Sequence, residues 1–191
     1  MGNEKPPLRW LLTGNPGVGK TTVIRAVVQR LEGLALAGFY TGETREGGRR
    51  TGFRIVTLDG QEGILATLGS RPPVVGRYSV HLEELERLAD RCLDPARSPA
   101  DLYVIDEIGK MELLSSRFRR RITELLEGPA NILATIARKG DGFVDRIRRR
   151  RDVELVEVTR ANRDRLPEEL ARRIEAALGP RGTPPGALPQ R

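Results

Sequence analysis

The chain has 191 residues and 38% hydrophobic content, which is enough for one folded domain with a buried core and argues against a wholly disordered protein. Its 33 basic residues outnumber its 26 acidic ones, for a net charge of +7, and all but four of the basic residues are arginine. A single cysteine excludes an internal disulfide, a single histidine argues against a Ser-His-Asp triad, and no apolar run approaches the roughly 20 residues of a membrane helix, so we expect a cytoplasmic protein.

Apolar strands alternate with amphipathic helices over residues 1–178, the extent of the expected domain. The expected strands are residues 8–13, 39–45, 51–58, 63–68, 76–80, 102–105, 131–136 and 153–158. The expected helices are residues 21–31, 82–93, 115–127, 142–151 and 167–178. This alternation predicts an α/β three-layer sandwich with a mainly parallel sheet and an antiparallel hairpin insert at about residues 38–68. Residues 179–191, rich in Gly and Pro, are expected to be a disordered tail.

Ligands bind at the carboxyl ends of the strands in such sheets, so the turn after Thr13 is the first candidate binding site along the chain. That turn matches the phosphate-loop motif of P-loop NTPases, between a strand and a helix. The motif residues are Gly14, Asn15, Pro16, Gly17, Val18, Gly19, Lys20, Thr21 and Thr22. Backbone N–H groups and the helix N-terminus attract a phosphate there, Lys20 is expected to reach the β- and γ-phosphates, and the Thr21 hydroxyl is expected to bind Mg²⁺.

Two adjacent acids follow the apolar strand 102–105. Asp106 fits the role of Mg²⁺ partner, and Glu107 fits a general base that polarises the attacking water. An Asp-Glu pair at this place is typical of phosphate-loop enzymes that hydrolyse their nucleotide. The alternative for Glu107 is that it only caps a helix or pairs with an arginine. Glu112 is a second candidate for the base.

Arginines near the expected site carry the next hypotheses. Arg138, after the strand 131–136, either stabilises transition-state charge like an arginine finger or pairs with nearby aspartates. Thr41, Glu43 and Arg45 share one face of the hairpin by period-two alternation. These hairpin arginines, Arg45, Arg50 and Arg54, either close over the triphosphate or stay exposed in solvent.

The loop after Val158 and two arginine runs have two interpretations each. Asn162 either hydrogen-bonds the nucleobase or caps the last helix, and Arg163 is expected to stack on the base. The runs 117–121 and 146–151 are either solvated helix faces or sites for nucleic-acid phosphates. Aromatic residues make up only 4% of the chain, so the solvated faces are favoured and a nucleic-acid partner is the weaker interpretation.

The sequence resembles a known family, the small phosphate-loop nucleoside triphosphatases first described from thermophiles, whose animal member is called cancer-related nucleoside triphosphatase. The resemblance covers about residues 8–178 and depends on five stretches in order. These stretches are 14–22, 38–45, 50–60, 106–112 and 158–164. The first is shared by many NTPases, and the other four together are specific to this family.

The resemblance implies a Mg²⁺-dependent hydrolase that accepts ATP, GTP, CTP and UTP and releases NDP and phosphate. The family often carries a histidine where this chain has Ala137. If that histidine assists catalysis, then Arg138 or Lys139 must suffice here.

Two other functions stay open at this point. The first is a nucleotide or nucleoside kinase, in which the hairpin insert would be the lid over a second substrate. The second is an NTP-dependent nucleic-acid binding or switch protein, suggested by the charge and the arginine runs. A monomer is favoured, and a dimer stays open because a neighbouring subunit is able to supply an arginine finger.

Overall fold

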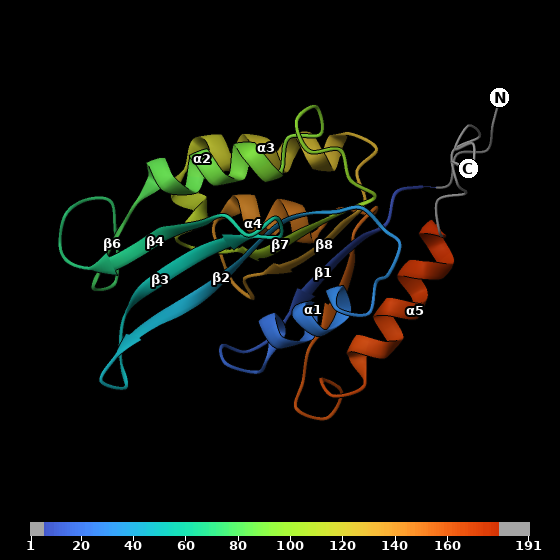
Figure 1. Cartoon of the computed structure of the whole chain (residues 1–191), viewed down its shortest axis with the longest axis horizontal. Helices are drawn as coiled ribbons and strands as arrows, with labels where there is room; N and C mark the ends of the chain where they lie inside the picture. The colour runs from blue at the N-terminus through green and yellow to red at the C-terminus, as the bar shows by residue number, and fades with distance from the viewer. Residues whose placement is uncertain (1–5, 180–191) are drawn as a thin grey trace, which may run out of the picture.

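The computed structural model describes residues 6–179 of the chain. Its strands form one sheet, and helices cover both faces of that sheet (Figure 1). The strands are β1 (Arg9–Thr13), β2 (Leu36–Glu46), β3 (Arg49–Thr57), β4 (Glu62–Leu68), β5 (Val74–Val75), β6 (Tyr78–Val80), β7 (Leu102–Ile108), β8 (Ile132–Ile136) and β9 (Glu154–Glu157). The helices are α1 (Lys20–Val28), α2 (Leu82–Cys92), α3 (Ser116–Glu127), α4 (Gly142–Arg148) and α5 (Leu166–Leu178), with a short 3₁₀ turn at Glu112–Leu114.

The sheet joins a parallel half to an antiparallel half, in the order β5-β6-β4-β3-β2-β7-β8-β1-β9 within the described residues. Strands β2, β7, β8, β1 and β9 are parallel neighbours, and β3, β4, β6 and β5 add antiparallel partners beyond β2. The predicted α/β fold with a mainly parallel sheet and an antiparallel insert is therefore confirmed, and its architecture is that of a P-loop NTPase.

Strand β2 belongs to both halves of the sheet, whereas the sequence predicted only its hairpin part, residues 39–45. Residues 36–40 pair in parallel with residues 102–106 of β7, and the later part of β2 forms the hairpin with β3. The expected strand 39–45 is thus the second part of a longer core strand. Figure 1 shows β2 and β3 running together beyond the rest of the sheet. The hairpin is therefore attached directly to the strand beside β7.

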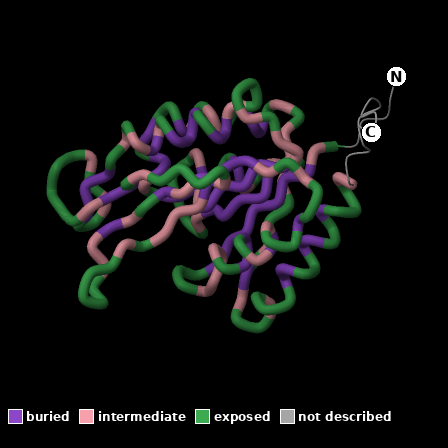
Figure 2. The backbone as a smooth tube through the Cα atoms, viewed as in Figure 1, coloured by how far each residue is buried: buried purple, intermediate pink, exposed green. Residues whose placement is uncertain are grey.

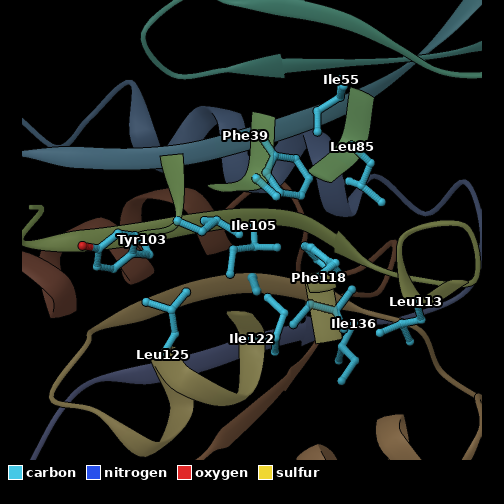
Figure 3. Close-up of a cluster of buried hydrophobic side chains, with 14 of the residues drawn as sticks. Phe39, Ile55, Leu85, Tyr103, Ile105, Leu113, Phe118, Ile122, Leu125 and Ile136 are labelled. Atoms are coloured by element: carbon cyan, nitrogen blue, oxygen red, sulfur yellow. The ribbon is translucent and has the colours of Figure 1, made fainter. Parts of the chain in front are cut away.

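Alternate residues of the central strands feed two separate cores. Leu11 and Ile105 face the layer that contains α2, α3 and α4, whereas Leu12 and Val104 face the layer that contains α1 and α5. Figure 3 shows the first core, where Phe118 lies close to Ile105 and to other side chains of the sheet. Buried residues concentrate in the central strands in Figure 2, and the far end of the hairpin is mostly exposed. Burial on both faces explains the short, almost continuous apolar runs of these strands.

Several element boundaries differ from those predicted, among them the end of α1 at Val28 rather than at residue 31. The fourth helix ends at Arg148 rather than at residue 151, and the segment 76–80 is a turn followed by the short strand β6. Strand β7 continues to Ile108, so Asp106 and Glu107 lie within it, where its pairing with β8 shifts register. The predicted tail, apart from Gly179, lies outside the described residues. No helix among residues 6–179 is long and apolar enough to cross a membrane.

Candidate functional site

The phosphate loop lies between the end of β1 at Thr13 and the start of α1 at Lys20. Gly19 precedes the helix with φ of 110°, a conformation that side chains other than hydrogen rarely allow. A Cβ on Gly14 would stand 2.6 Å from the carbonyl oxygen of Val158, so the loop packs closely against the end of β9. The glycines of the motif thus give the loop the strand–loop–helix context that the sequence predicted.

A cavity of about 1070 Å³ opens beside this loop. Lys20, Thr21 and Thr22 line it together with the glycines of the loop and with Asn15 and Pro16. Glu107 and Arg138 line the same cavity. The structure therefore brings together residues that the sequence assigned from three distant segments of the chain. Val18 instead lines a smaller hollow of about 270 Å³ on the β9 side of the loop.

Asp106 is buried at the phosphate-loop end of the site, with 1% of its surface exposed. Its Oδ1 atom accepts a hydrogen bond of 2.6 Å from the hydroxyl of Thr135, at the end of β8. Its Oδ2 atom is buried without a hydrogen-bond partner in the protein. Burial raises the pKa of Asp106, while the hydroxyls of Thr135 and Thr21 and the charge of Lys20 act to lower it. A buried carboxylate oxygen without a partner is costly unless a cation or a donor joins it.

These residues fit a magnesium ion bound with a nucleotide. The free Oδ2 atom of Asp106 and the Thr21 hydroxyl are oxygen donors, which Mg²⁺ prefers. The described residues contain no cluster of three or more His, Cys, Asp or Glu side chains able to hold a metal. Mg²⁺ commonly takes only one or two carboxylates and completes its shell with water and phosphate oxygens, so the donor set suits an ion that arrives with its nucleotide.

Glu107 and Glu112 are two further carboxyl groups of the cavity. Burial raises the pKa of Glu107, Lys20 lowers it and Asp106 raises it further. Glu112 is 4% exposed, and burial, with contributions from Glu107 and Asp106, raises its pKa to about 8. Of the two, Glu107 has the cation of Lys20 acting on it, which favours the charged form that a general base needs.

Two of the predicted arginines, Arg138 and Arg45, differ in whether they line the cavity. The Nη1 atom of Arg138 donates a 2.6 Å hydrogen bond to the side-chain oxygen of Asn15, so Arg138 reaches across the cavity to the phosphate loop. Arg45 does not line the cavity: its guanidinium binds Glu43, at 2.6 and 3.0 Å, and the carbonyl of Gly48 near the hairpin tip. Arg45 therefore has the exposed position that was one of its two predicted alternatives, two residues farther out on β2 than Glu43. Arg50, on the returning strand, lines the cavity instead.

The loop after β9 contacts the phosphate loop through Arg163. Its Nη1 atom donates to the carbonyl of Val18 at 3.2 Å, and its side chain lies next to Gly19. Asn162 uses both ends of its amide within its own loop, accepting from Thr159 N–H and donating to the Glu157 carbonyl at 2.9 Å. Asn162 therefore shapes this loop, and Thr159 rather than Asn162 lines the smaller hollow.

Arg148 is a site-supporting residue that the sequence reading missed. Its Nη1 atom donates to the Thr13 hydroxyl at 3.1 Å and to the Ala137 carbonyl at 3.2 Å. It thereby links the end of β1 to the end of β8 directly behind the phosphate loop. Arg148 was not singled out within the arginine run 146–151. Its spacing is a usable signal, because Arg148 lies four residues after the buried Val144 and so faces inward on α4.

Sequence comparison identifies the family to which this site belongs. A family model described as NTPase matches residues 9–171, which include the phosphate loop, the Asp106–Glu107 pair and the loop after β9. The chain belongs to this NTPase family. Among the similar curated proteins of the family, the nucleoside-triphosphatase THEP1 of Thermotoga sp. (strain RQ2) is 45% identical over 164 residues, covering 85% of this chain and 93% of the relative. The human cancer-related nucleoside-triphosphatase is 42% identical over 182 residues, covering 87% and 96% respectively.

Solved structures of two family members have the same fold as this NTPase. The crystal structure of THEP1 from the hyperthermophile Aquifex aeolicus matches with a TM-score of 0.79 and 36% identity, over 88% of this chain and 99% of that one. The solution structure of the human cancer-related nucleoside triphosphatase matches with a TM-score of 0.76 and 40% identity, over 90% and 98%. The family expected from the five sequence stretches is confirmed.

Proposed function

We propose that this protein is a Mg²⁺-dependent nucleoside triphosphatase that hydrolyses ATP, GTP, CTP and UTP to the diphosphate and phosphate. The observation that carries the proposal is the single cavity in which Glu107 shares space with Lys20 and Thr21 of the phosphate loop. Family membership and the names of the relatives support hydrolysis of nucleoside triphosphates. Broad base tolerance is consistent with Asn162, the predicted base contact, using its amide inside its own loop.

The chain's residues divide the reaction between binding and proton transfer. The loop N–H groups and Lys20 hold the β- and γ-phosphates, and Thr21 and Asp106 would hold Mg²⁺, whose charge neutralises the phosphate oxygens. Glu107 takes a proton from water as the water oxygen bonds to the γ-phosphorus. The bond from that phosphorus to its bridging oxygen breaks, and the electron pair leaves on the diphosphate. Arg138, already at the loop, stabilises the charge of the transition state.

Phosphate release from the four nucleotides with Mg²⁺ tests the proposal. Wild type is expected to turn over without any acceptor, and removal of Mg²⁺ with a chelator is expected to stop it. Lys20→Ala is expected to abolish release, and Glu107→Gln to lower kcat by about 10²–10⁴-fold with nucleotide binding retained. Glu32→Gln, on the exposed turn after α1, is the matched control and is expected to match wild type. Full turnover in Glu107→Gln would disprove its role as base and make Glu43 or Glu112 the next residues to test.

We further propose that the enzyme is a monomer and is cytoplasmic. Arg138 of the same chain already reaches the phosphate loop, so no arginine from a second subunit is needed. Cytoplasm supplies the nucleoside triphosphates that such a loop binds. Size-exclusion chromatography with light scattering, with and without ADP and Mg²⁺, is expected to give the mass of one chain, and a stable dimer would contradict this part.

A further inference from the structure

The large cavity has two ends of different chemistry. Its first end is the phosphate loop with Lys20 and Thr21. Its other end is walled by strands of the antiparallel half, through Phe53 of β3, Leu65 of β4 and Val75 of β5. We call this second end, with Glu43 and Arg50 beside it, the distal arm. A triphosphate and its cation are polar, so they leave the apolar wall of the distal arm unexplained.

The distal arm lies beyond β7 in the sheet order, on the side away from β1 and its phosphate loop. Strand β7 carries Glu107 and pairs with β2, and β3 and β4 follow β2 in the sheet. A path from the phosphate loop past Glu107 therefore leads into the distal arm. The hollow of about 270 Å³ lies in the opposite direction, between the phosphate loop and residues 157–160. That second hollow leaves a separate place for the nucleotide's own base.

Phe53 is fixed in the wall of the distal arm by contacts on two sides. The guanidinium of Arg50 lies over its ring, 5.4 Å from the centroid, and the ring of Tyr78 meets it edge-on at 5.1 Å. Glu43 is the direct neighbour of Phe53 across the β2–β3 ladder and accepts a 2.6 Å hydrogen bond from Arg50. The Nε atom of Arg50 is buried without a hydrogen-bond partner. The distal arm thus combines an aromatic ring, aliphatic side chains, a carboxylate and a donor that has no acceptor.

The volume permits a second ligand. Pockets of about 300–1,000 Å³ bury most of a small ligand's surface, usually with mostly apolar walls and a few polar groups that fix its orientation. At about 1070 Å³ the cavity lies just above that range, and the residues of the phosphate loop line only part of it. A flat heteroaromatic ring suits the wall at Phe53, and hydroxyl or ring N–H groups suit Glu43.

We propose that the distal arm binds a nucleoside or a similar heteroaromatic alcohol, which takes the γ-phosphoryl group in place of water. The acceptor hydroxyl loses its proton to Glu107 as its oxygen bonds to the γ-phosphorus. The bond from that phosphorus to the bridging oxygen breaks, with the electron pair leaving on the diphosphate. The products are a nucleoside monophosphate and NDP. This inference rests on the proposed function, because it needs a triphosphate bound with its γ-phosphate beside Glu107.

Product partition from γ-labelled ATP tests the transfer. Wild type is incubated with labelled ATP, Mg²⁺ and adenosine, guanosine, cytidine or uridine at millimolar concentration, and labelled phosphate and nucleoside monophosphate are separated. At least one nucleoside is expected to carry label. Val75→Trp, which fills the distal arm, and Phe53→Leu, which removes its ring, are expected to lower the ratio of monophosphate to phosphate at least tenfold. Phe143→Leu is the matched control, because Phe143 also lies under arginines, at 5.4 and 5.7 Å, but outside the cavity.

Nucleoside binding is measured separately on the protein loaded with ADP and Mg²⁺. Saturation-transfer NMR is expected to show contact with the nucleoside in wild type and Phe143→Leu, and none in Val75→Trp. If no nucleoside binds and none is labelled while phosphate release continues, the acceptor site is wrong and the hydrolase stands. Binding without transfer would also overturn the proposal, since it would make the distal arm an inhibitor site. Absence of both phosphate release and transfer would overturn the proposed function with it.

Discussion

Three carboxyl groups in or next to the cavity, those of Asp106, Glu107 and Glu112, differ because their immediate neighbours differ. Asp106 has the hydroxyl of Thr135 within 2.6 Å, and Lys20 acts on its charge. Glu112 comes from the 3₁₀ turn after β7, and burial together with the charges of Glu107 and Asp106 raises its pKa to about 8. The same residue type therefore has different surroundings: the charge of Lys20 favours the ionised form of Glu107, the proposed base, whereas Glu112 is held mainly as the neutral acid at neutral pH.

The raised pKa of Glu112 predicts a loss of stability as pH rises. The folded state keeps a proton up to about pH 8, whereas the unfolded chain releases it near the ordinary value of 4.5. Between these values the folded state binds more protons, so the free energy of unfolding falls with pH, by up to about 1.4 kcal/mol per pH unit for one such group. Urea unfolding at pH 6, 7 and 8, without nucleotide or Mg²⁺, is expected to show a smaller slope for Glu112→Gln than for wild type. Glu83→Gln, on the exposed face of α2, is expected to keep the wild-type slope, and an unchanged slope in Glu112→Gln would refute the assignment.

Arg138 predicts a catalytic effect without a large effect on folding. Its guanidinium reaches the phosphate loop through Asn15 from an exposed position after β8, so little packing is lost on truncation. Arg138→Ala is expected to lower kcat by about 10³-fold, the lower end of arginine-finger effects, with little change in melting temperature. Arg146→Ala, on the exposed side of α4, is the control. Equal kcat values for the two variants would show that Arg138 does not contact the reacting phosphate.

At the scale of single elements, strands position the side chains of the site, and helix termini fix how the helices pack on the sheet. Asp106 and Glu107 lie where the β7–β8 pairing shifts, and α3 packs in the same core as Ile105 of β7 through Phe118. Helix α3 is capped at its N-terminus by Ser115, whose hydroxyl oxygen accepts from Phe118 N–H at 3.0 Å and donates to Glu86 of α2 at 2.5 Å. One buried hydroxyl thus ends the segment 109–114 at the cavity, starts α3 and joins it to α2.

Ser115→Ala is expected to destabilise the protein by about 1 kcal/mol, because an N-cap hydrogen bond and the bond to Glu86 are both lost. Ser116→Ala changes the same residue type one position later, on the exposed first turn of α3. It is expected to stay within about 0.5 kcal/mol of wild type. Chemical unfolding of the two variants at one pH measures the difference, and equal stabilities would contradict the capping role.

For the whole molecule, sequence patterns predicted what depends on local spacing. The phosphate loop, the acid pair and the alternation of strands and helices are short-range signals, and the fold they imply is confirmed. The positions of Arg45 and Arg148 are not predicted by such local patterns. Which guanidinium reaches the cavity depends on how far out on the hairpin it lies and on which side of α4 it faces, and both are set by tertiary packing. The distal arm likewise combines residues of four strands, so no single stretch of sequence predicts it.

Several arginines of the two runs form ion pairs with acidic residues of neighbouring segments. Arg117 and Arg121 of α3 pair with Asp90 of α2, and Arg119 pairs with Asp141 at 2.7 Å. Arg150 pairs with Glu127 at 2.5 Å and with Asp152 at 2.8 Å. Nucleic-acid affinity depends on cations that are free to replace the counterions of the phosphates. These ion pairs therefore lower the number of free cations in the two arginine runs, within a chain whose net charge is +7.

Weak binding to nucleic acid is the expected consequence. Fluorescence anisotropy with a labelled 20-nucleotide DNA or RNA at 150 mM salt is expected to show no binding tighter than the roughly 10⁻⁴–10⁻⁶ M of non-specific association, and neither polymer is expected to stimulate phosphate release. Asp90→Asn removes the carboxylate shared by Arg117 and Arg121 and is expected to raise DNA affinity and its salt dependence. Asp164→Asn, whose side chain is 91% exposed, changes the net charge equally and is expected to do much less. Tight, salt-sensitive binding by wild type, together with stimulated hydrolysis, would instead favour a nucleic-acid switch and would show that the ion pairs open readily in solution.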